Sequence, residues 1–102
     1  MKVKFKNVEK EFKASYMTEQ RVIRDGTTIG WVSMISLSDE SITAQELDNI
    51  LIPDNISEIS CIGEDFETPI VNTITGYEKV TSCVVKYTSS KTTAEIQMTK
   101  GV

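Results

Sequence analysis

The pair Asp25-Gly26 constrains this chain most, because it separates two stretches rich in β-branched and apolar residues, "QRVI" and "TTIGWVSMISL". A two-residue hairpin turn needs positive φ at both central positions, and Asp-Gly is one of the pairs that adopts it readily. A strand over residues 31 to 37 would place Trp31, Ser33, Ile35 and Leu37 on one side and Val32, Met34 and Ser36 on the other, and both sides are largely apolar near Trp31. We therefore predict a β-hairpin around Asp25-Gly26, whose second strand lies inside a sheet.

A second hairpin is predicted over residues 76 to 101, "GYEKVTSCVVKYTSSKTTAEIQMTKG". Two β-rich stretches, "KVTSCVVKY" and "TTAEIQMTK", flank the polar turn "TSSK". Ala94, Ile96 and Met98 fall on one face of the last strand, and polar residues fall on the other. This pattern is expected of an antiparallel sheet with one buried and one solvent-exposed face. Gly76 interrupts the preceding β-branched run and predicts a bulge or a bend there.

One helix is predicted, at about residues 43 to 51. Thr43 and Glu46 have the spacing of a capping box, and Ile42 and Leu47 have that of a hydrophobic staple. The residue before a proline is disfavoured in the helical conformation, so Ile52-Pro53 ends the helix. A helix of about two turns is unstable alone in water, so it must pack on the sheet.

The remaining stretches are shorter or ambiguous. "MKVKF" alternates Lys with apolar residues and predicts a lysine-rich edge strand, whereas residues 7 to 20 fit a helix or an irregular strand. A short strand is predicted at residues 57 to 62. The fold class is thus α+β, mostly antiparallel β: a small sheet or sandwich of hairpins with one short helix packed on it. At 102 residues, the chain forms a single β-rich domain, residues 1–102.

The residue types of the common catalytic and metal sites are scarce. The chain contains no histidine and two cysteines, so histidine-based triads are excluded and a cysteine zinc site is incomplete. The carboxylates do not follow EF-hand spacing, and "DGTTIG" lacks the Gly-Lys-Ser/Thr of a phosphate loop. We predict no enzyme activity, no cofactor and no metal. Cys61 and Cys83 are predicted to be buried free thiols, with a disulfide as the alternative. Trp31 is predicted to anchor the core beneath the helix, with a role in partner binding as the alternative.

Charge is distributed unevenly along the chain. The net charge is -4 at pH 7, which disfavours nucleic-acid binding. The first 13 residues are rich in lysine, whereas residues 39 to 67 are acidic and contain no Lys or Arg. A basic edge opposite an acidic face would steer copies of the protein toward each other, although a solvated surface explains the same pattern.

The closing hairpin and the segment before it are rich in threonine, which tolerates both strand structure and water. A weakly charged Thr-rich sheet surface suits pairing with another chain, and an ordinary solvent face is the alternative. The candidate partner contacts are therefore the basic edge, the acidic loop and the wet face of the last strand: Lys2, Lys4, Lys6, Glu64, Asp65, Glu67, Thr93, Glu95 and Gln97.

No signal-peptide core is recognised at the amino terminus, and no apolar run approaches the ~18 residues of a membrane span, so we predict no membrane role. The stretches "RVIRDGTTIGWV", "ITAQELDNILIPDNISEI" and "GYEKVTSCVVKYTSSKTTAEIQMTKG" resemble small accessory proteins of phages and prophages of Gram-positive bacteria, in particular β-rich tail or virion components. The resemblance extends over most of the chain but includes no defined motif, so it implies no site residue.

The resemblance implies a non-enzymatic assembly protein of a phage or prophage particle, located in the virion or the host cytoplasm. Its partners would be other copies of itself, as a homo-oligomer, or other virion proteins. The alternative is a small acidic inhibitor that binds a host protein by mimicking nucleic acid.

Overall fold

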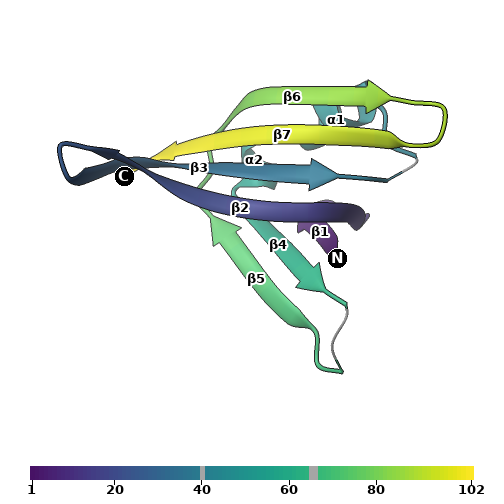
Figure 1. Cartoon of the computed structure of the whole chain (residues 1–102), viewed down its shortest axis with the longest axis horizontal. Coiled ribbons are helices and arrows are strands. Elements are labelled where there is room, and N and C mark those ends of the chain that lie inside the picture. The colour runs from purple at the N-terminus through teal and green to yellow at the C-terminus, as the bar shows by residue number, and fades with distance from the viewer. Residues whose placement is uncertain (40, 65–66) are drawn as a thin grey trace.

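The computed structural model describes residues 1–39, 41–64 and 67–102, and it confirms a mostly antiparallel α+β fold (Figure 1). Within these residues, seven strands form one sheet in the order β5-β4-β1-β2-β3-β7-β6, and every neighbouring pair is antiparallel. Two short helices in the described part of the chain lie between β3 and β4. The elements are β1 (Lys2–Phe5), β2 (Phe12–Arg24), β3 (Thr27–Leu37), α1 (Ala44–Ile50), α2 (Pro53–Ile56), β4 (Glu58–Gly63), β5 (Ile70–Thr75), β6 (Lys79–Tyr87) and β7 (Thr92–Gly101).

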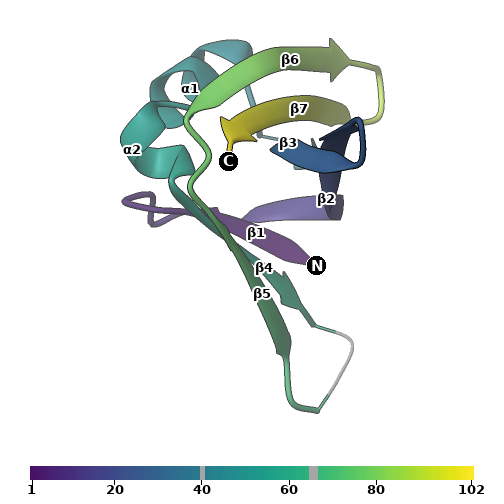
Figure 2. The same ribbon diagram turned by 90° about the vertical axis from the view of Figure 1, so that its left-hand side faces the viewer.

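The sheet is strongly curled, because a short connection joins its two edge strands. β5 and β6 form opposite edges of the sheet, yet only residues 76–78 join them. Thr75 and Lys79 are four Cα–Cα steps apart, which limits their separation to about 15 Å. Gly76 makes the bend with a φ of +83°, as the sequence indicated. The two edges therefore approach each other at this end, and Figure 2 shows the two halves of the sheet facing each other across the interior.

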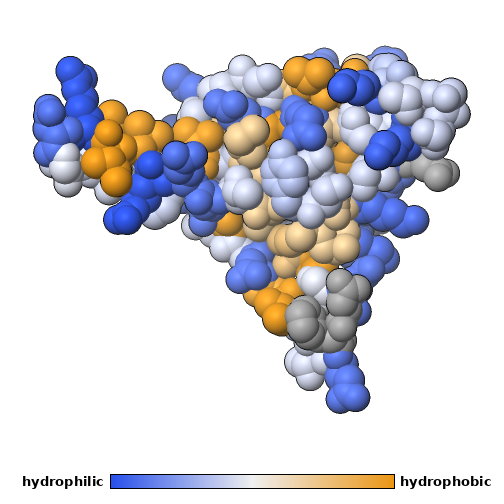
Figure 3. Space-filling model, in the orientation of Figure 1, coloured by the Kyte–Doolittle hydropathy of each residue, from blue (hydrophilic) through white to orange (hydrophobic). Residues whose placement is uncertain are grey.

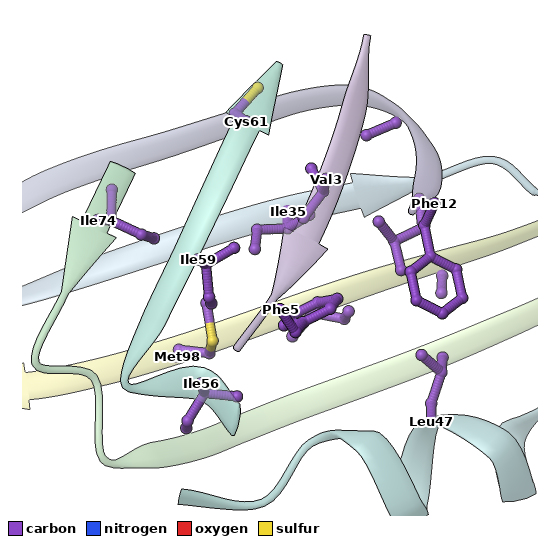
Figure 4. Close-up of a cluster of buried hydrophobic side chains, with 14 of the residues drawn as sticks. Val3, Phe5, Phe12, Ile35, Leu47, Ile56, Ile59, Cys61, Ile74 and Met98 are labelled. Atoms are coloured by element: carbon purple, nitrogen blue, oxygen red, sulfur yellow. The ribbon is translucent and has the colours of Figure 1, made fainter. Parts of the chain in front are cut away.

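The core fills the concave side of this curled sheet. Phe5 and Phe12 pack edge to face with their ring centroids 6.0 Å apart, and Leu47 of α1 and Ile56 of α2 close over them (Figure 4). Ala94, Ile96 and Met98 of β7 are all buried, so the predicted inner face of the last strand is confirmed. The largest fully buried side chains are Val3, Phe5, Phe12, Ile35, Leu37, Ile42, Leu47, Ile56, Ile59, Tyr77, Ile96 and Met98.

Both predicted hairpins are confirmed. Asp25 and Gly26 have φ values of +51° and +78°, as a two-residue turn between β2 and β3 requires. β6 spans residues 79–87 and pairs with β7. Residues 7 to 20, which fitted either a helix or a strand, mostly belong to β2: Phe12 and Ala14 are buried in alternation, Phe12 pairs with β1, and the residues from Ala14 onward pair with β3.

The predicted helix is confirmed as α1, and a second helix follows it. The Thr43 side chain accepts a hydrogen bond from the Glu46 backbone N–H at 3.1 Å, which caps the helix, and Leu47 is buried. Pro53 does end α1, but it also occupies the first turn of α2, where its fixed φ and missing N–H are favourable. No sequence pattern predicted α2, since a single helical turn is too short to leave an apolar period.

Two expectations about strands and core are wrong. β1 is an interior strand, because it pairs with β4 along its whole length and with β2 at Lys2–Lys13 and Val3–Phe12. Trp31 is only half-buried and lies within β3 close to the end of its pairing with β7, where Lys100 rather than a helix covers its ring. Fully buried Tyr77, in the connection between the sheet edges, is instead the large aromatic anchor.

A polar cluster fastens the curled sheet at the end where its edges meet. The Tyr77 hydroxyl donates to Glu19 Oε2 at 2.8 Å. Lys100 Nζ donates to the Thr75 carbonyl at 2.5 Å, lies 3.9 Å from Glu19 Oε2 and sits 4.7 Å from the centre of the Tyr77 ring. The cluster thus joins β2, β5, β7 and the 76–78 connection. Burial first, and then the hydrogen bond to Glu19, raises the pKa of Tyr77 above its ordinary value near 10.

We expect Tyr77→Phe to lower the free energy of unfolding by about 1–2 kcal/mol, because it removes a buried hydrogen bond to a carboxylate. Tyr16→Phe is a matched control: its hydroxyl also donates to a carboxylate at 2.8 Å, but at an exposed site, so the loss should be smaller. Urea unfolding measures both. Equal losses would contradict the fastening role of Tyr77.

The same cluster predicts a loss of stability in alkali. Since the folded pKa of Tyr77 lies above the unfolded value, the folded state keeps a proton that the unfolded state releases above pH 10. Stability from this group is therefore complete below pH 10 and declines as pH rises further. Urea midpoints measured at pH 8 and 11 should fall less in Tyr77→Phe than in the parent protein. An equal fall in both would show that Tyr77 is not responsible.

Gly30 predicts a steric effect where β3 meets β7. A Cβ at this position would lie 2.8 Å from the Lys100 carbonyl oxygen, whereas a Cβ at Gly101 would meet nothing within 4 Å. Gly30→Ala should therefore destabilise the protein by about 1–3 kcal/mol in urea unfolding, and Gly101→Ala should change it by less than about 0.5 kcal/mol. A neutral Gly30→Ala would mean that the two strands separate there without cost.

Candidate interaction surfaces

The candidate contacts from the sequence fall into two groups that the structure keeps apart. Lys2, Lys4 and Lys6 lie in or directly after β1, and Thr93, Glu95 and Gln97 lie on β7, with β2 and β3 between these strands. Glu64 follows β4 beside β1, and Glu67 is exposed further along the same loop. Asp65 lies outside the residues that the structure describes.

The basic and acidic segments are neighbours rather than opposite faces. Lys2 Nζ lies 3.2 Å from Glu64 Oε1, and Lys10 Nζ lies 3.3 Å from Glu46 Oε1. The expected arrangement of a basic edge opposite an acidic face is therefore wrong. The antiparallel pairing of β1 with β4 brings the lysines alongside the acidic loop, so part of its charge is compensated within one chain.

The outer face of β7 is polar, as the sequence indicated, but its charged residue is already engaged. Glu95 accepts hydrogen bonds from the Tyr16 hydroxyl and from Ser36 Oγ, both at 2.8 Å. The hydrogen bond to Glu95 is the main reason that the pKa of Tyr16 is raised. β7 has partners on both sides, so it offers a face and no free strand edge.

The threonine-rich stretch does not form one surface. Thr73 and Thr75 lie on β5, whereas Thr81, Thr93 and Thr99 lie on β6 and β7, at the opposite edge of the sheet. The sequence places these residues close together because the chain passes directly from one edge to the other. The prediction of a continuous Thr-rich pairing surface is therefore wrong.

An exposed apolar arm, which was not predicted from the sequence, projects from the sheet. β7 pairs with β3 only as far as Gly30, whose partner on β2 is Val22, so residues 23–29 extend beyond the body as a two-stranded ribbon (Figure 1). We call residues 21–29 the arm, with Arg21 and Val22 at its base. Val22, Ile23 and Ile29 are 38%, 55% and 48% exposed on it. Figure 3 shows apolar surface gathered there, bordered by hydrophilic surface. The signal was present in the sequence, because apolar residues flank the Asp25-Gly26 turn.

The arm also concentrates a particular kind of charge. Arg21 and Arg24 are the only arginines in the chain, and both are exposed on the arm, with Asp25 as its only acidic residue. Arginine forms forked hydrogen bonds with carboxylates and is enriched at the energetically important positions of interfaces. The arm is thus a basic, apolar projection on a protein of negative net charge.

A groove lies between α1 and the inner side of the edge strand β6. Its volume is about 440 Å³, and Asp48 is the charged residue of its lining. The other lining residues are Ala44, Leu47, Leu51, Val80, Cys83, Val85 and Tyr87. The Tyr87 hydroxyl accepts a hydrogen bond from the Ala44 backbone N–H at 2.9 Å, which ties the end of β6 to the start of α1. We call this feature the α1–β6 groove.

Both cysteines are free, as predicted, but only Cys61 is buried. Cys83 is exposed in the α1–β6 groove, which corrects the expectation that both thiols are buried. Partial burial, and then the negative charge of Asp48, raises the pKa of Cys83. Sequence alone did not reveal the difference, because both residues have apolar neighbours and their exposure depends on which strand forms the sheet edge.

The described residues 1–39, 41–64 and 67–102 contain no group of three or more Cys, Asp or Glu side chains placed to hold a metal ion. Within the same residues, neither helix has the length or apolarity to cross a membrane.

No protein-family model, no curated protein and no solved structure matches this chain.

The cysteine environments predict unequal reactivity. In the folded protein, a thiol reagent such as Ellman's reagent should modify one cysteine readily, and Cys83→Ser should abolish this phase. Cys61 should react only on unfolding. The Cys83 reaction should also be slower at pH 7.5 than that of a model thiol, because its raised pKa lowers the thiolate fraction. Two equally fast thiols would contradict this placement.

Proposed function

We propose that the protein is a non-enzymatic assembly protein of a phage or prophage particle, a tail or virion component that acts through contacts with other copies of itself. The observation that carries the proposal is the arm, with three exposed apolar side chains and both arginines on a ribbon that has left the core. The resemblance of the hairpin and helix stretches to phage accessory proteins supports the same class.

The exposed apolar surface of the arm contributes nothing to the stability of an isolated molecule. A two-stranded ribbon is marginally stable in water without a further layer, and its apolar side chains gain nothing while they remain solvated. Burying one Ile or Val side chain fully contributes roughly 1.5–3 kcal/mol. A partner that covers Val22, Ile23 and Ile29 would therefore both stabilise the ribbon and supply much of the binding energy.

The acidic-inhibitor alternative receives less support. A nucleic-acid mimic needs negative charge that remains available to a basic partner. Here Lys2 pairs with Glu64 and Lys10 pairs with Glu46, so lysines of the same chain lie among the acidic residues that would do the mimicking.

The test is the solution mass, by light scattering behind size exclusion, over a series of protein concentrations at low and high salt. We expect a mass above that of one chain that rises with concentration, and we expect Ile23→Glu to lower it by placing a charge within the contact. Ile70→Glu is the matched control, because Ile70 is 50% exposed on a different hairpin. A monomer at every concentration, or association that Ile23→Glu leaves unchanged, would remove the proposal.

A further inference from the structure

We infer that the arm of one copy docks into the α1–β6 groove of a second copy, so that the chains join head to tail. This inference rests on the proposed function and names the two surfaces through which the copies meet. It follows from three properties of the arm and the groove: their apolar character, their opposite charges and their positions on the molecule.

The apolar character of the two surfaces matches. The arm presents Ile23 and Ile29, each about half exposed, on a ribbon narrow enough to enter a groove. The groove presents the half-buried side chains Leu51, Val80 and Val85, and its volume of about 440 Å³ offers room for aliphatic side chains. Docking would remove apolar surface from water on both partners at once, which is the main favourable contribution to association.

The charges are complementary. Asp48 is exposed on α1 at the side of the groove, and its negative charge helps to raise the pKa of the Cys83 thiol on the facing strand β6. Residues 39–67, which include α1, contain no Lys or Arg, whereas the arm carries the two arginines of the chain. An arm that enters the groove on the α1 side brings Arg21 and Arg24 toward Asp48, the one charged residue of the lining. A second copy is therefore a better occupant than an acidic peptide, which Asp48 would repel.

The positions require two molecules. The arm points away from the body at one end of the β2–β3 pair, whereas α1 and β6 lie over the body (Figure 1). One copy cannot reach its own groove, because β3 and β7 hold the base of the arm in the sheet as far as Gly30. The contact is also between unlike surfaces, so each bound copy still offers a free arm at one end and a free groove at the other.

The unpaired backbone of β6 does not explain the docking by itself. Lys79 and Lys86 lie on this edge, and a bulge falls between Val80 and Ser82. Lysines and bulges are features that discourage simple edge-to-edge pairing of sheets. Side-chain insertion beside β6 avoids that obstacle and uses the inner side of the strand, where Val80, Cys83 and Val85 line the groove.

The first experiment mixes two defective variants. Ile23→Glu disables the arm and keeps the groove, whereas Asp48→Arg, at an exposed helical position, disables the groove and keeps the arm. Each alone should weaken self-association about tenfold or more, and an equimolar mixture should stop at the mass of two chains, because only one productive contact can form. Arg21→Asp and Arg24→Asp introduced together into Asp48→Arg should restore longer assemblies by exchanging the charges.

The second experiment uses the native thiol of the groove. In an Ile23→Cys variant, oxidation with diamide should link residue 23 of one copy to Cys83 of the next and give a ladder of dimers, trimers and longer species on a non-reducing gel. Adding Cys83→Ser should abolish the ladder, and Ile70→Cys, at the control position, should give none. Cys61 should not compete, because it is only 8% exposed.

The outcomes separate this inference from the proposed function. In one outcome, the parent protein associates and Ile23→Glu prevents the association, but Asp48→Arg has no effect and no ladder forms. The arm then docks elsewhere, and this result contradicts only the inferred contact with the groove. If the mixture of variants grows beyond two chains, or stays monomeric while the parent protein associates, the head-to-tail contact is also overturned. A parent protein that is monomeric throughout removes both.

Discussion

The three-residue connection between Thr75 and Lys79 is the constraint on which the rest of the structure depends. It joins strands at opposite edges of a seven-stranded sheet, so the sheet has to curl until those edges approach each other. Curling creates a concave side deep enough for one core and leaves space there for α1 and α2. It also explains why Tyr77, within the connection, is fully buried, and why Lys100, Glu19 and Thr75 converge on it from three different strands.

Local features were predictable from sequence wherever a single residue pair or a short period determines them. The Asp25-Gly26 turn, the cap at Thr43 and the inward face of β7 depend on backbone conformation or on alternation within one element, and all three are as predicted. The predictions that proved wrong depended on the order of the strands in the sheet. β1 carries the lysines of an edge strand but lies inside the sheet, and Cys83 has the neighbours of a buried residue but lies on an edge strand. Pairing between distant strands leaves no local period in the sequence.

The candidate site illustrates the same division. The apolar residues around Asp25-Gly26 were visible in the sequence, but a period-two pattern is the same whether a strand has a neighbour or not. Only the end of the β3–β7 register at Gly30 shows that Val22 lies at the base of the arm and that Ile23 and Ile29 lie beyond the body. The groove was out of reach for sequence reasoning, because it combines a helix with a strand that follows about 30 residues later.

A head-to-tail contact would also give a role to the fastening cluster, which lies beside the base of the arm. Chains joined by unlike surfaces close into a ring or continue as a helical filament, according to the rotation that each contact imposes. Such growth needs a rigid angle between the two surfaces of one copy, since a flexible joint would give no defined geometry. The base of the arm meets this need, because Trp31 and Lys100 are directly paired beside it and Lys100 is held by the Tyr77 cluster. The cluster that fastens the curled sheet thus also holds the base of the arm.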